Sequence, residues 1–511
     1  MRFSPADGRR DQHHGDARSA AVPFGSRLAQ LGRDRPGRTA LWLVGAHGPT
    51  EQLTWDDLDR RATQLGRWLA GRGAGVGGRV ALSLRNSVEL VLAVLGSYKI
   101  GAVPVPVRWD LPEWERQRLL ACMDPVVVLT EEDRVAMRSA GTLPDDPLPD
   151  VVSPEAWGIC SSGSTGTPKV IVRAVPAVYD PAVPVAAMVD SYRPLARPQR
   201  IGVPAPMYHT NGFTVTTNLL GGEEVVLLER FDAGRFLDAV DELGVTGFIA
   251  ATPMLLRMAR LPDFDSRPLR TVRWVQQGAS DIPRWLAQRW IDKVGPEQVF
   301  FSYGSTEGLG VVACRGDEWL AHPGTVGRPT GGAEVRVLDE DDRPVAPGTV
   351  GTIFLRSPTG TVHRYLGDAP PVPRTADGFG TVGDMGWLDD DGYLYVADRR
   401  TDLILSGGAN VYPAEVEAAL SEHPGVADVV VIGLDDPDWG KRVHAVVQPG
   451  PGVDLAPDAV MAFARERLAP YKVPKSVEIV ERIPRTEAGK VNRSAMVAAR
   501  QGAPVGASEE P

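Results

Sequence analysis

Hydrophobic and polar positions follow a repeating order of strand, helix and strand along the first half of the chain. Apolar residues at helical spacing predict an amphipathic helix from Thr54 to about Arg72, and Asp57 completes a capping pattern at its start. A second helix is predicted at 86–100. Buried strands are predicted at 38–44, 79–84, 102–107, 126–129, 225–228 and 247–250. This order is typical of an α/β domain built on a largely parallel sheet.

The pattern changes in the second half. From about Val335, short apolar runs between Asp, Pro and Gly turns predict a β-rich subdomain. Past Arg399 the α/β order returns, with elements predicted at 413–421, 426–434, 443–447 and 457–468. The simplest division has a disordered leader at 1–24, a large N-terminal domain at 25–398, a small C-terminal domain at 399–501 and a disordered tail at 502–511.

Composition narrows the class of protein. The 511 residues include 65 acidic and 55 basic side chains, a net charge of −10, which argues against nucleic acid as a partner. The three cysteines are widely spaced, so a disulfide framework is not expected and a reducing, cytoplasmic compartment is predicted. The most apolar stretch, 88–107, contains two charged residues and two prolines, so we expect no integral membrane contact.

The strongest local signal for chemistry lies at 161–169. Five hydroxyl residues, two glycines and a lysine share these nine positions. Glycines let a backbone approach a polyphosphate, hydroxyls donate hydrogen bonds to it, and lysine supplies charge. The alternative is a flexible surface loop. The GxGxxG match at 378–383 lacks the flanking strand and helix of a dinucleotide site. No cluster has the spacing of a protein-caged metal site, but Mg²⁺ that arrives with a nucleotide needs only one or two carboxylates.

Further motifs follow the phosphate loop in a fixed order. They are Pro206-Met207-Tyr208-His209, Tyr303-Gly304-Ser305-Thr306-Glu307, Gly383-Asp384, Asp398-Arg399, the run from Ser406 to Glu415, and the run from Pro484 to Lys490. In this order they resemble the adenylate-forming superfamily of acyl-CoA synthetases, peptide-synthetase adenylation domains and beetle luciferases. The resemblance covers residues 25 to 500.

This resemblance implies an α/β fold in which two α/β subdomains and a small β-barrel-like subdomain form the N-terminal domain. That domain, which binds ATP and the acid, would be hinged to a small, mobile α+β C-terminal domain. The implied reaction has two halves. A carboxylate attacks the α-phosphate of MgATP to give acyl-adenylate and pyrophosphate, and coenzyme A then displaces AMP. ATP, Mg²⁺ and coenzyme A are therefore the expected cofactors.

The resemblance also assigns roles to individual residues. Lys490 would bridge the carboxylate and the phosphate, because two anions must be neutralised before they can meet. Glu307 would hold Mg²⁺ and Thr306 would contact the α-phosphate. Asp384 and Arg399 would bind the ribose, and Tyr303 would lie against adenine. The remaining nucleotide contacts would be Ser161, Ser162, Gly163, Ser164, Thr165, Gly166, Lys169, Gly278, Ala279, Ser280, Gly304 and Ser305. The hinge would be Arg400 and Thr401, and the thiol tunnel Ser406, Gly407 and Gly408.

The acid is predicted to be apolar near its carboxylate. No acidic residue occurs between Ile201 and Leu220, where amino-acid adenylation domains place an aspartate for the substrate ammonium. His209 would line or gate the pocket and act in catalysis, and glycines near the base would leave room for a bulky or cyclic acid. The other predicted pocket residues are Trp274, Gln277, Gly278, Gly304 and Gly308.

Departures from the family pattern keep alternatives open. Four positions differ from the usual family residue: serine for threonine at 161, valine for glycine at 170, aspartate for glycine at 398 and lysine for glutamate at 441. None of these changes removes an adenylation residue. Thr401 replaces the usual lysine or aspartate of the hinge. A complete acyl-CoA synthetase is the favoured function. An enzyme that hands its acyl group to a carrier protein or partner ligase, and a non-catalytic binding protein, are the alternatives. High Gly, Ala, Arg and Pro content indicates a bacterial source, and a homodimer is left open.

Overall fold

The computed structural model describes residues 21–161, 169–182, 187–192, 194–278, 281–360, 362–399, 402–406, 408–487 and 489–501. The predicted tail and residues 1–20 of the predicted leader lie outside these ranges. The last leader positions are ordered instead. Val22–Pro23 forms β1, which pairs with β9 (Val178–Tyr179), and α1 begins at Phe24.

A largely parallel sheet is the centre of the N-terminal domain in the described part of the chain. Its strand order is β16-β15-β14-β13-β12-β10-β11-β2-β3, and the inner strands from β14 to β2 run parallel to one another. The strands are β2 (Thr39–Gly45), β3 (Gly48–Thr54), β10 (Arg200–Val203), β11 (Glu224–Leu228), β12 (Gly247–Ala250), β13 (Trp274–Gln277), β14 (Val299–Gly304), β15 (Val311–Arg315) and β16 (Arg328–Pro329). The associated helices are α7 (Thr210–Leu220), α8 (Ala233–Leu243), α9 (Thr252–Ala259), α10 (Arg284–Val294) and α11 (Gly316–Ala321).

The second α/β unit of this domain contains two small sheets. One is parallel, in the order β5-β4-β6, and the other is antiparallel, in the order β19-β8-β7. Their strands are β4 (Arg79–Ser83), β5 (Val103–Pro106), β6 (Val127–Thr130), β7 (Trp157–Ser161), β8 (Lys169–Arg173) and β19 (His363–Tyr365). The helices are α1 (Phe24–Asp34), α2 (Trp55–Ala70), α3 (Val88–Lys99), α4 (Glu113–Met123), α5 (Arg134–Ser139) and α6 (Ala187–Tyr192), with 3₁₀ helices at Glu131–Asp133 and Ala140–Thr142. A further 3₁₀ helix, Phe264–Ser266, packs against α10 of the large-sheet unit.

Two of these helices form where the sequence predicts them. The Thr54 side chain accepts a hydrogen bond from the Asp57 amide and so caps α2. Helix α3 is buried along its whole length. Its charges are paired, Glu89 with Arg134 at 2.9 Å and Lys99 with Asp59 at 2.5 Å, which explains how an apolar stretch carries charge without leaving the core. No helix in the described ranges is long and apolar enough to span a bilayer.

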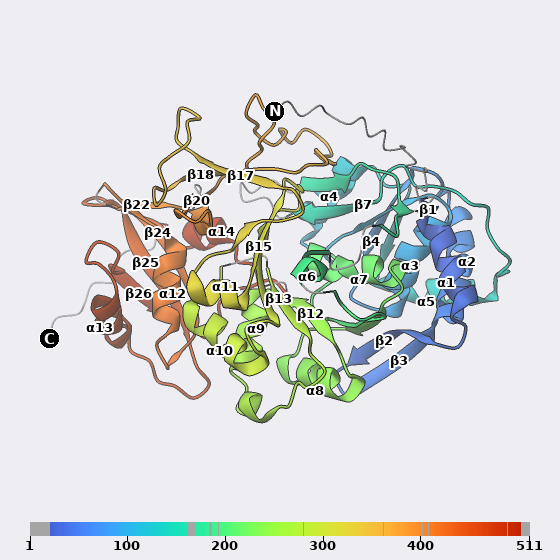
Figure 1. Cartoon of the computed structure of the whole chain (residues 1–511), viewed down its shortest axis with the longest axis horizontal. Helices are drawn as coiled ribbons and strands as arrows, with labels where there is room; N and C mark the ends of the chain where they lie inside the picture. Colours follow the sequence, from blue (N-terminus) through green and yellow to red (C-terminus); the bar gives the residue numbers. More distant parts are fainter. Residues whose placement is uncertain are drawn as a thin grey trace, which may run out of the picture.

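The β-rich subdomain is an antiparallel sheet in the order β17-β18-β20-β21, drawn at the top of Figure 1. Its strands are β17 (Glu334–Leu338), β18 (Gly351–Arg356), β20 (Asp384–Leu388) and β21 (Leu394–Arg399). The strands predicted from Val335 onward belong to this sheet. Cross-strand pairing places Asp384 opposite Arg399.

The C-terminal domain is the orange and red body at the left of Figure 1. Its sheet has the order β23-β22-β25-β24, and β26 pairs parallel to β25. The elements are β22 (Ile404–Ser406), β23 (Ala409–Val411), α12 (Pro413–Ser421), β24 (Val426–Asp436), β25 (Gly440–Pro449), α13 (Pro457–Arg467), β26 (Ser476–Ile479) and α14 (Arg493–Ala498). The domain has apolar clusters of its own, around Val431 and Val446.

Candidate active site

A tight turn follows β14 at the carboxyl end of the large sheet, where α/β proteins bind ligands. The amide of Gly308 donates to the carbonyl of Ser305 at 3.0 Å, which closes the turn around Thr306 and Glu307. Gly308 has a φ of +65°, and a Cβ there would lie 2.4 Å from Nδ1 of His363. Only glycine fits this position, so the turn presents Thr306 and Glu307 in one fixed arrangement.

The carboxylate of Glu307 is held by the neighbouring strand β19. The Tyr365 hydroxyl donates to Oε1 of Glu307 at 2.8 Å, and Nζ of Lys169, the first residue of β8, lies 4.7 Å from the centroid of the Tyr365 ring. Glu307 and Thr306 supply hard oxygen donors, which suit Mg²⁺. Among the described residues no group of three or more His, Cys, Asp or Glu side chains could hold a metal. Glu307 and Thr306 therefore suit a Mg²⁺ ion most of whose ligands are water molecules and phosphate oxygens.

A second carboxylate lies at the start of β20. Asp384 is buried, and its Oδ2 accepts a hydrogen bond from the Tyr303 hydroxyl at 2.8 Å. Tyr303 is near the end of β14, and Arg399 is the cross-strand partner of Asp384. The fold thus brings together the three residues predicted to contact the nucleoside, although the Arg399 side chain lies outside the described structure.

Helix α7 begins at the predicted acid pocket. His209 occupies its N-cap position, and the Met207 amide before it donates to Oδ1 of buried Asn86 at 2.8 Å. A Cβ on Gly212 would lie 2.1 Å from the Pro206 carbonyl oxygen, so the helix approaches this segment closely. At the other side, the hydroxyls of Thr210 and Thr306 are 3.2 Å apart. The start of α7 and the Glu307 turn therefore form one continuous wall.

The His209 ring is a neutral group. Burial, and then the positive charges of Lys490 and Arg108, lower its pKa to about 3. The ring packs against Tyr208, with centroids 4.8 Å apart. A neutral imidazole beside an aromatic ring gives an uncharged wall, which suits an acid that is apolar beyond its carboxylate.

The turn that carries Lys490 reaches this region from the C-terminal domain. The Gly489 amide donates to the Thr486 carbonyl at 2.8 Å, and Nη1 of Arg485 donates to the Gly489 carbonyl at 2.9 Å. Arg485 is itself fixed by Asp428, with Nε 2.6 Å from Oδ2. Gly489 has a φ of +79°, and a Cβ there would lie 2.5 Å from Cγ of Pro253 at the start of α9. The lysine thus belongs to a hydrogen-bonded turn that contacts the N-terminal domain.

Strand β13 carries the predicted residues Trp274 and Gln277, and Gly278 directly follows it. Trp274 is the first residue of the strand and is buried against Gly247, where an added Cβ would lie 2.0 Å from the indole. Gln277 is buried and donates to the Thr252 hydroxyl at 3.0 Å. Gln276 donates to Ser302 at 3.0 Å. Trp274 is therefore a core residue at the far end of the strand, and Gln277 and Gly278 lie at the end that faces Glu307.

Several predicted residues fall outside the described structure. These are Ser162, Gly163, Ser164, Thr165, Gly166, Ala279, Ser280, Arg400, Thr401 and Gly407, together with the Ser161 side chain. Their predicted roles stay predictions. Of the tunnel residues that are described, Ser406 is buried at the end of β22, and Gly408 has a φ of +80° with open space around it.

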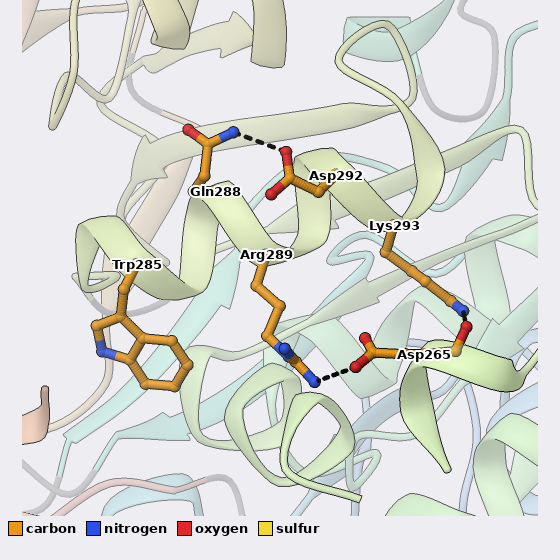
Figure 2. Close-up of a pocket in the computed structure, with 6 residues that line it drawn as sticks. All are labelled: Asp265, Trp285, Gln288, Arg289, Asp292 and Lys293. Carbon is orange, nitrogen blue, oxygen red and sulfur yellow. Dashed lines mark hydrogen bonds and ion pairs between the residues drawn. The ribbon is translucent and has the colours of Figure 1, made fainter. Parts of the chain in front are cut away.

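A large cavity elsewhere is not part of this site. It has a volume of about 590 Å³ and lies between α10 and Asp265 (Figure 2). Its charged side chains already have partners within the protein. Arg289 pairs with Asp265 at 3.2 Å, Lys293 donates to the Asp265 carbonyl at 2.9 Å, and Gln288 donates to Asp292 at 2.8 Å. None of the residues predicted to act on ligands lines it.

Sequence reasoning missed two residues that organise the site. Asn86 binds the Ala205 carbonyl at 3.1 Å and the Leu228 carbonyl at 2.8 Å, in addition to the Met207 amide. Tyr365 binds Glu307. The alternation of His363 and Tyr365, with Arg364 between them, is a strand pattern that places both rings on one face, and this was the available signal for Tyr365.

Comparisons with known proteins extend over most of the chain. A family model described as AMP-binding enzyme matches residues 28–366, and one described as AMP-binding enzyme C-terminal domain matches residues 415–490. Feruloyl-CoA synthase from Amycolatopsis sp is 34% identical over 488 residues, which are 92% of this chain and 97% of that protein. A fatty acid–[acyl-carrier-protein] ligase from Streptomyces coeruleorubidus is 32% identical over 475 residues, 86% of this chain and 90% of that protein.

A solved structure is similar over the same length. It is o-succinylbenzoate coenzyme A synthetase from Bacillus subtilis in complex with ATP and magnesium ion. The TM-score is 0.77 at 25% identity, with 93% of this chain and 99% of that chain covered. The likeness therefore includes both the large and the small domain.

Proposed function

Because the chain belongs to the family of AMP-binding enzymes, we propose a specific division of labour for the residues of its candidate site. The chain is an ATP-dependent, AMP-forming acid–CoA ligase, with ATP, Mg²⁺ and coenzyme A as cofactors. The predicted resemblance, fold class and enzyme class are thereby confirmed. The roles of single residues and the identity of the acid are the content of the proposal.

The observation that carries the proposal is the position of the Lys490 turn. Gly489 lies against Pro253. The positive charge of Lys490 contributes to the lowered pKa of His209 at the start of α7. A cation from the C-terminal domain thus faces the wall that Thr210 and Thr306 complete. Lys490 neutralises the acid carboxylate and the α-phosphate while the first attacks the second. The electron pair comes from the carboxylate, and pyrophosphate leaves with the pair of the broken P–O bond.

The metal and nucleotide roles follow from the donor types. Glu307 holds Mg²⁺, which would neutralise the departing pyrophosphate, and Lys169 binds phosphate oxygens. Asp384 accepts hydrogen bonds from ribose hydroxyls, since a carboxylate can serve two donors. Thr306 donates its hydroxyl to the α-phosphate. Together these residues orient the nucleotide so that its α-phosphorus faces the acid pocket.

The acid is proposed to be aromatic or otherwise cyclic. Two features support this class: the neutral His209 ring packed against Tyr208, and the absence of acidic residues from 201 to 220. Among the relatives, feruloyl-CoA synthase and o-succinylbenzoate coenzyme A synthetase are named for ring-containing acids. We place the reaction in the cytoplasm, where ATP and coenzyme A are available as its co-substrates.

A second acceptor for the acyl group has its own support. The Streptomyces coeruleorubidus relative is a fatty acid–[acyl-carrier-protein] ligase, and Thr401 departs from the usual hinge residue. We therefore keep transfer to a carrier-protein thiol as the alternative second half-reaction.

The test is pyrophosphate release with MgATP across a panel of aryl, fatty, steroidal and terpenoid acids. Each reaction is run with and without coenzyme A, and products are identified by mass spectrometry. Acyl-CoA from a ring-containing acid is the expected result. Acyl-adenylate that accumulates despite coenzyme A would favour the carrier-protein alternative. Turnover of straight-chain fatty acids alone would contradict the proposed acid class.

A further inference from the structure

One tyrosine contacts two oppositely charged residues of the site. The hydroxyl of Tyr365 donates to Oε1 of Glu307 at 2.8 Å, and its ring lies under Nζ of Lys169, 4.7 Å from the centroid. The residue is half-buried. Its side chain therefore contacts both a cation and an anion through different parts, the cation through the π-face and the anion through the hydroxyl.

The position of Tyr365 is fixed by backbone pairing and does not depend on Glu307. Strand β19 pairs antiparallel with β8, and Tyr365 lies opposite Ile171. The next residue, Leu366, is buried, and its amide donates to the Val170 carbonyl at 2.9 Å. The Leu366 carbonyl accepts a bond from the Cys122 thiol at 3.0 Å. Because the backbone on both sides of the ring is held, the tyrosine can orient the glutamate.

Lys169 and Glu307 would neutralise each other if they met. Opposite charges in a half-buried site attract strongly. Both side chains belong to the described part of the chain, yet no ion pair within 4 Å joins them. Tyr365 gives each of them a partner instead: Lys169 lies over the face of the ring, and Glu307 accepts a hydrogen bond from the hydroxyl. A lysine engaged by a π-face keeps its charge for phosphate, and a carboxylate that accepts one hydrogen bond on Oε1 keeps its second oxygen for a metal.

We propose that Tyr365 is a positioning residue that keeps Lys169 and Glu307 apart and aims the free carboxylate oxygen of Glu307 at the magnesium of MgATP. This inference rests on the proposed function, because it takes Glu307 as the metal ligand. It adds a residue that touches neither metal nor substrate and acts through its two neighbours.

The first test is Tyr365→Phe, which keeps the ring and removes the hydroxyl. The Mg²⁺ concentration for half-maximal pyrophosphate release should rise about 10-fold, the effect of one lost hydrogen bond to a charged group, while the rate at saturating Mg²⁺ changes less than 2-fold. A binding measurement needs no acid: Mn²⁺ affinity, by electron paramagnetic resonance with a non-hydrolysable ATP analogue, should weaken by the same factor. Tyr395→Phe, which removes a phenol that bonds Asp389 at 3.1 Å in the β-rich sheet, is the matched control.

The second test is Tyr365→Leu, which removes the ring as well. Lys169 and Glu307 should then pair, so affinity for the ATP analogue without metal should fall several-fold more than in Tyr365→Phe. Mn²⁺ affinity of Tyr365→Phe equal to wild type, or a lower saturated rate with an unchanged Mg²⁺ midpoint, would overturn the proposal. Glu307→Gln distinguishes a failure of the metal-site assignment from a failure of the proposed ligase reaction. If it binds Mn²⁺ as wild type does, the roles of Glu307 and Tyr365 both fail, while acyl-CoA formation would still support the ligase reaction.

Discussion

Gly489 lies where an added methyl group would collide with the N-terminal domain. A Cβ on this residue would be 2.5 Å from Cγ and 2.8 Å from Cβ of Pro253. Carbon atoms in contact are separated by about 3.5–4.0 Å, so the turn with Lys490 would have to move by roughly 1 Å. A misplacement of that size costs about 10²-fold in rate when it separates reacting groups. Gly489→Ala should therefore slow acyl-adenylate formation by about 10²-fold.

The substitution also strains the backbone, and a matched variant measures that part alone. Gly489 has a φ of +79°, where alanine costs roughly 1–2 kcal/mol. Gly452 lies in the same domain with a φ of +72° and no atom within 4 Å of an added Cβ. Gly452→Ala should therefore lower domain stability by a similar amount and leave adenylation near the wild-type rate.

The assay separates the two half-reactions. Pyrophosphate release reports adenylation, and thioester formation from synthetic acyl-adenylate and coenzyme A reports the second step. Gly489→Ala should lose the first and keep the second within a few-fold. If both alanine variants release pyrophosphate at the same rate, the contact with Pro253 does not position Lys490 and the reasoning is refuted.

Three further predictions concern charge, nucleotide and domain contact. His209→Gln should gain about 2–3 kcal/mol of stability over wild type at pH 4.5 and nothing at pH 7.5. The His209 pKa is about 3 in the folded protein and ordinarily 6.5. As the pH falls below 6.5, the unfolded wild type therefore binds a proton that the folded protein does not bind, and wild-type stability falls. Thermal melts at both pH values check this. Asp384→Asn should raise the KM for ATP about 10-fold or more without loss of helicity, because a carboxylate acceptor is replaced by an amide; an unchanged KM excludes the ribose role. Trp285→Phe removes the 3.2 Å bond from Nε1 to Ser421 Oγ on α12 and should slow adenylation by about 5-fold; in a double-mutant cycle with Ser421→Ala the two effects should not add.

Much of the fold could be predicted because local patterns agreed with the tertiary structure. Helix α12 begins at Pro413 and ends at Ser421 as predicted, since proline favours the first helical turn. The apolar run at 225–228 became β11, buried at every position. Trp274 shows where pattern reasoning ends. It was predicted to line the acid pocket, but which end of its strand faces the site depends on the neighbours, and Gly247 supplies the space that buries the indole.

The contacts that organise the site could not be predicted, because they join segments distant in sequence. Tyr365 reaches Glu307 only because β19 pairs with β8, a pairing between strands that lie nearly two hundred residues apart. Asn86 holds Met207 in the same way. A motif identifies which residue types recur, but the hydrogen bond that orients a carboxylate is decided by tertiary pairing. The motif residues were therefore found from the sequence, and the residues that position them were found from the structure.

The nature of the contact between the two domains is consistent with a lysine that serves only one half of the reaction. The apolar clusters of the described structure each belong to one domain, and none joins residues before 399 to residues after it. What joins the domains near the site is small and polar. Gly489 lies against Pro253, and hydrogen bonds run from Trp285 to Ser421, from Trp109 to Glu487 and from Arg260 to the Ala427 carbonyl. Domains without a shared apolar core move relative to each other at low cost. Under the proposed role of Lys490, its turn, which Arg485 bonds at Gly489, would bring the lysine to the site for adenylation and withdraw it with its domain when a thiol must reach the acyl-adenylate.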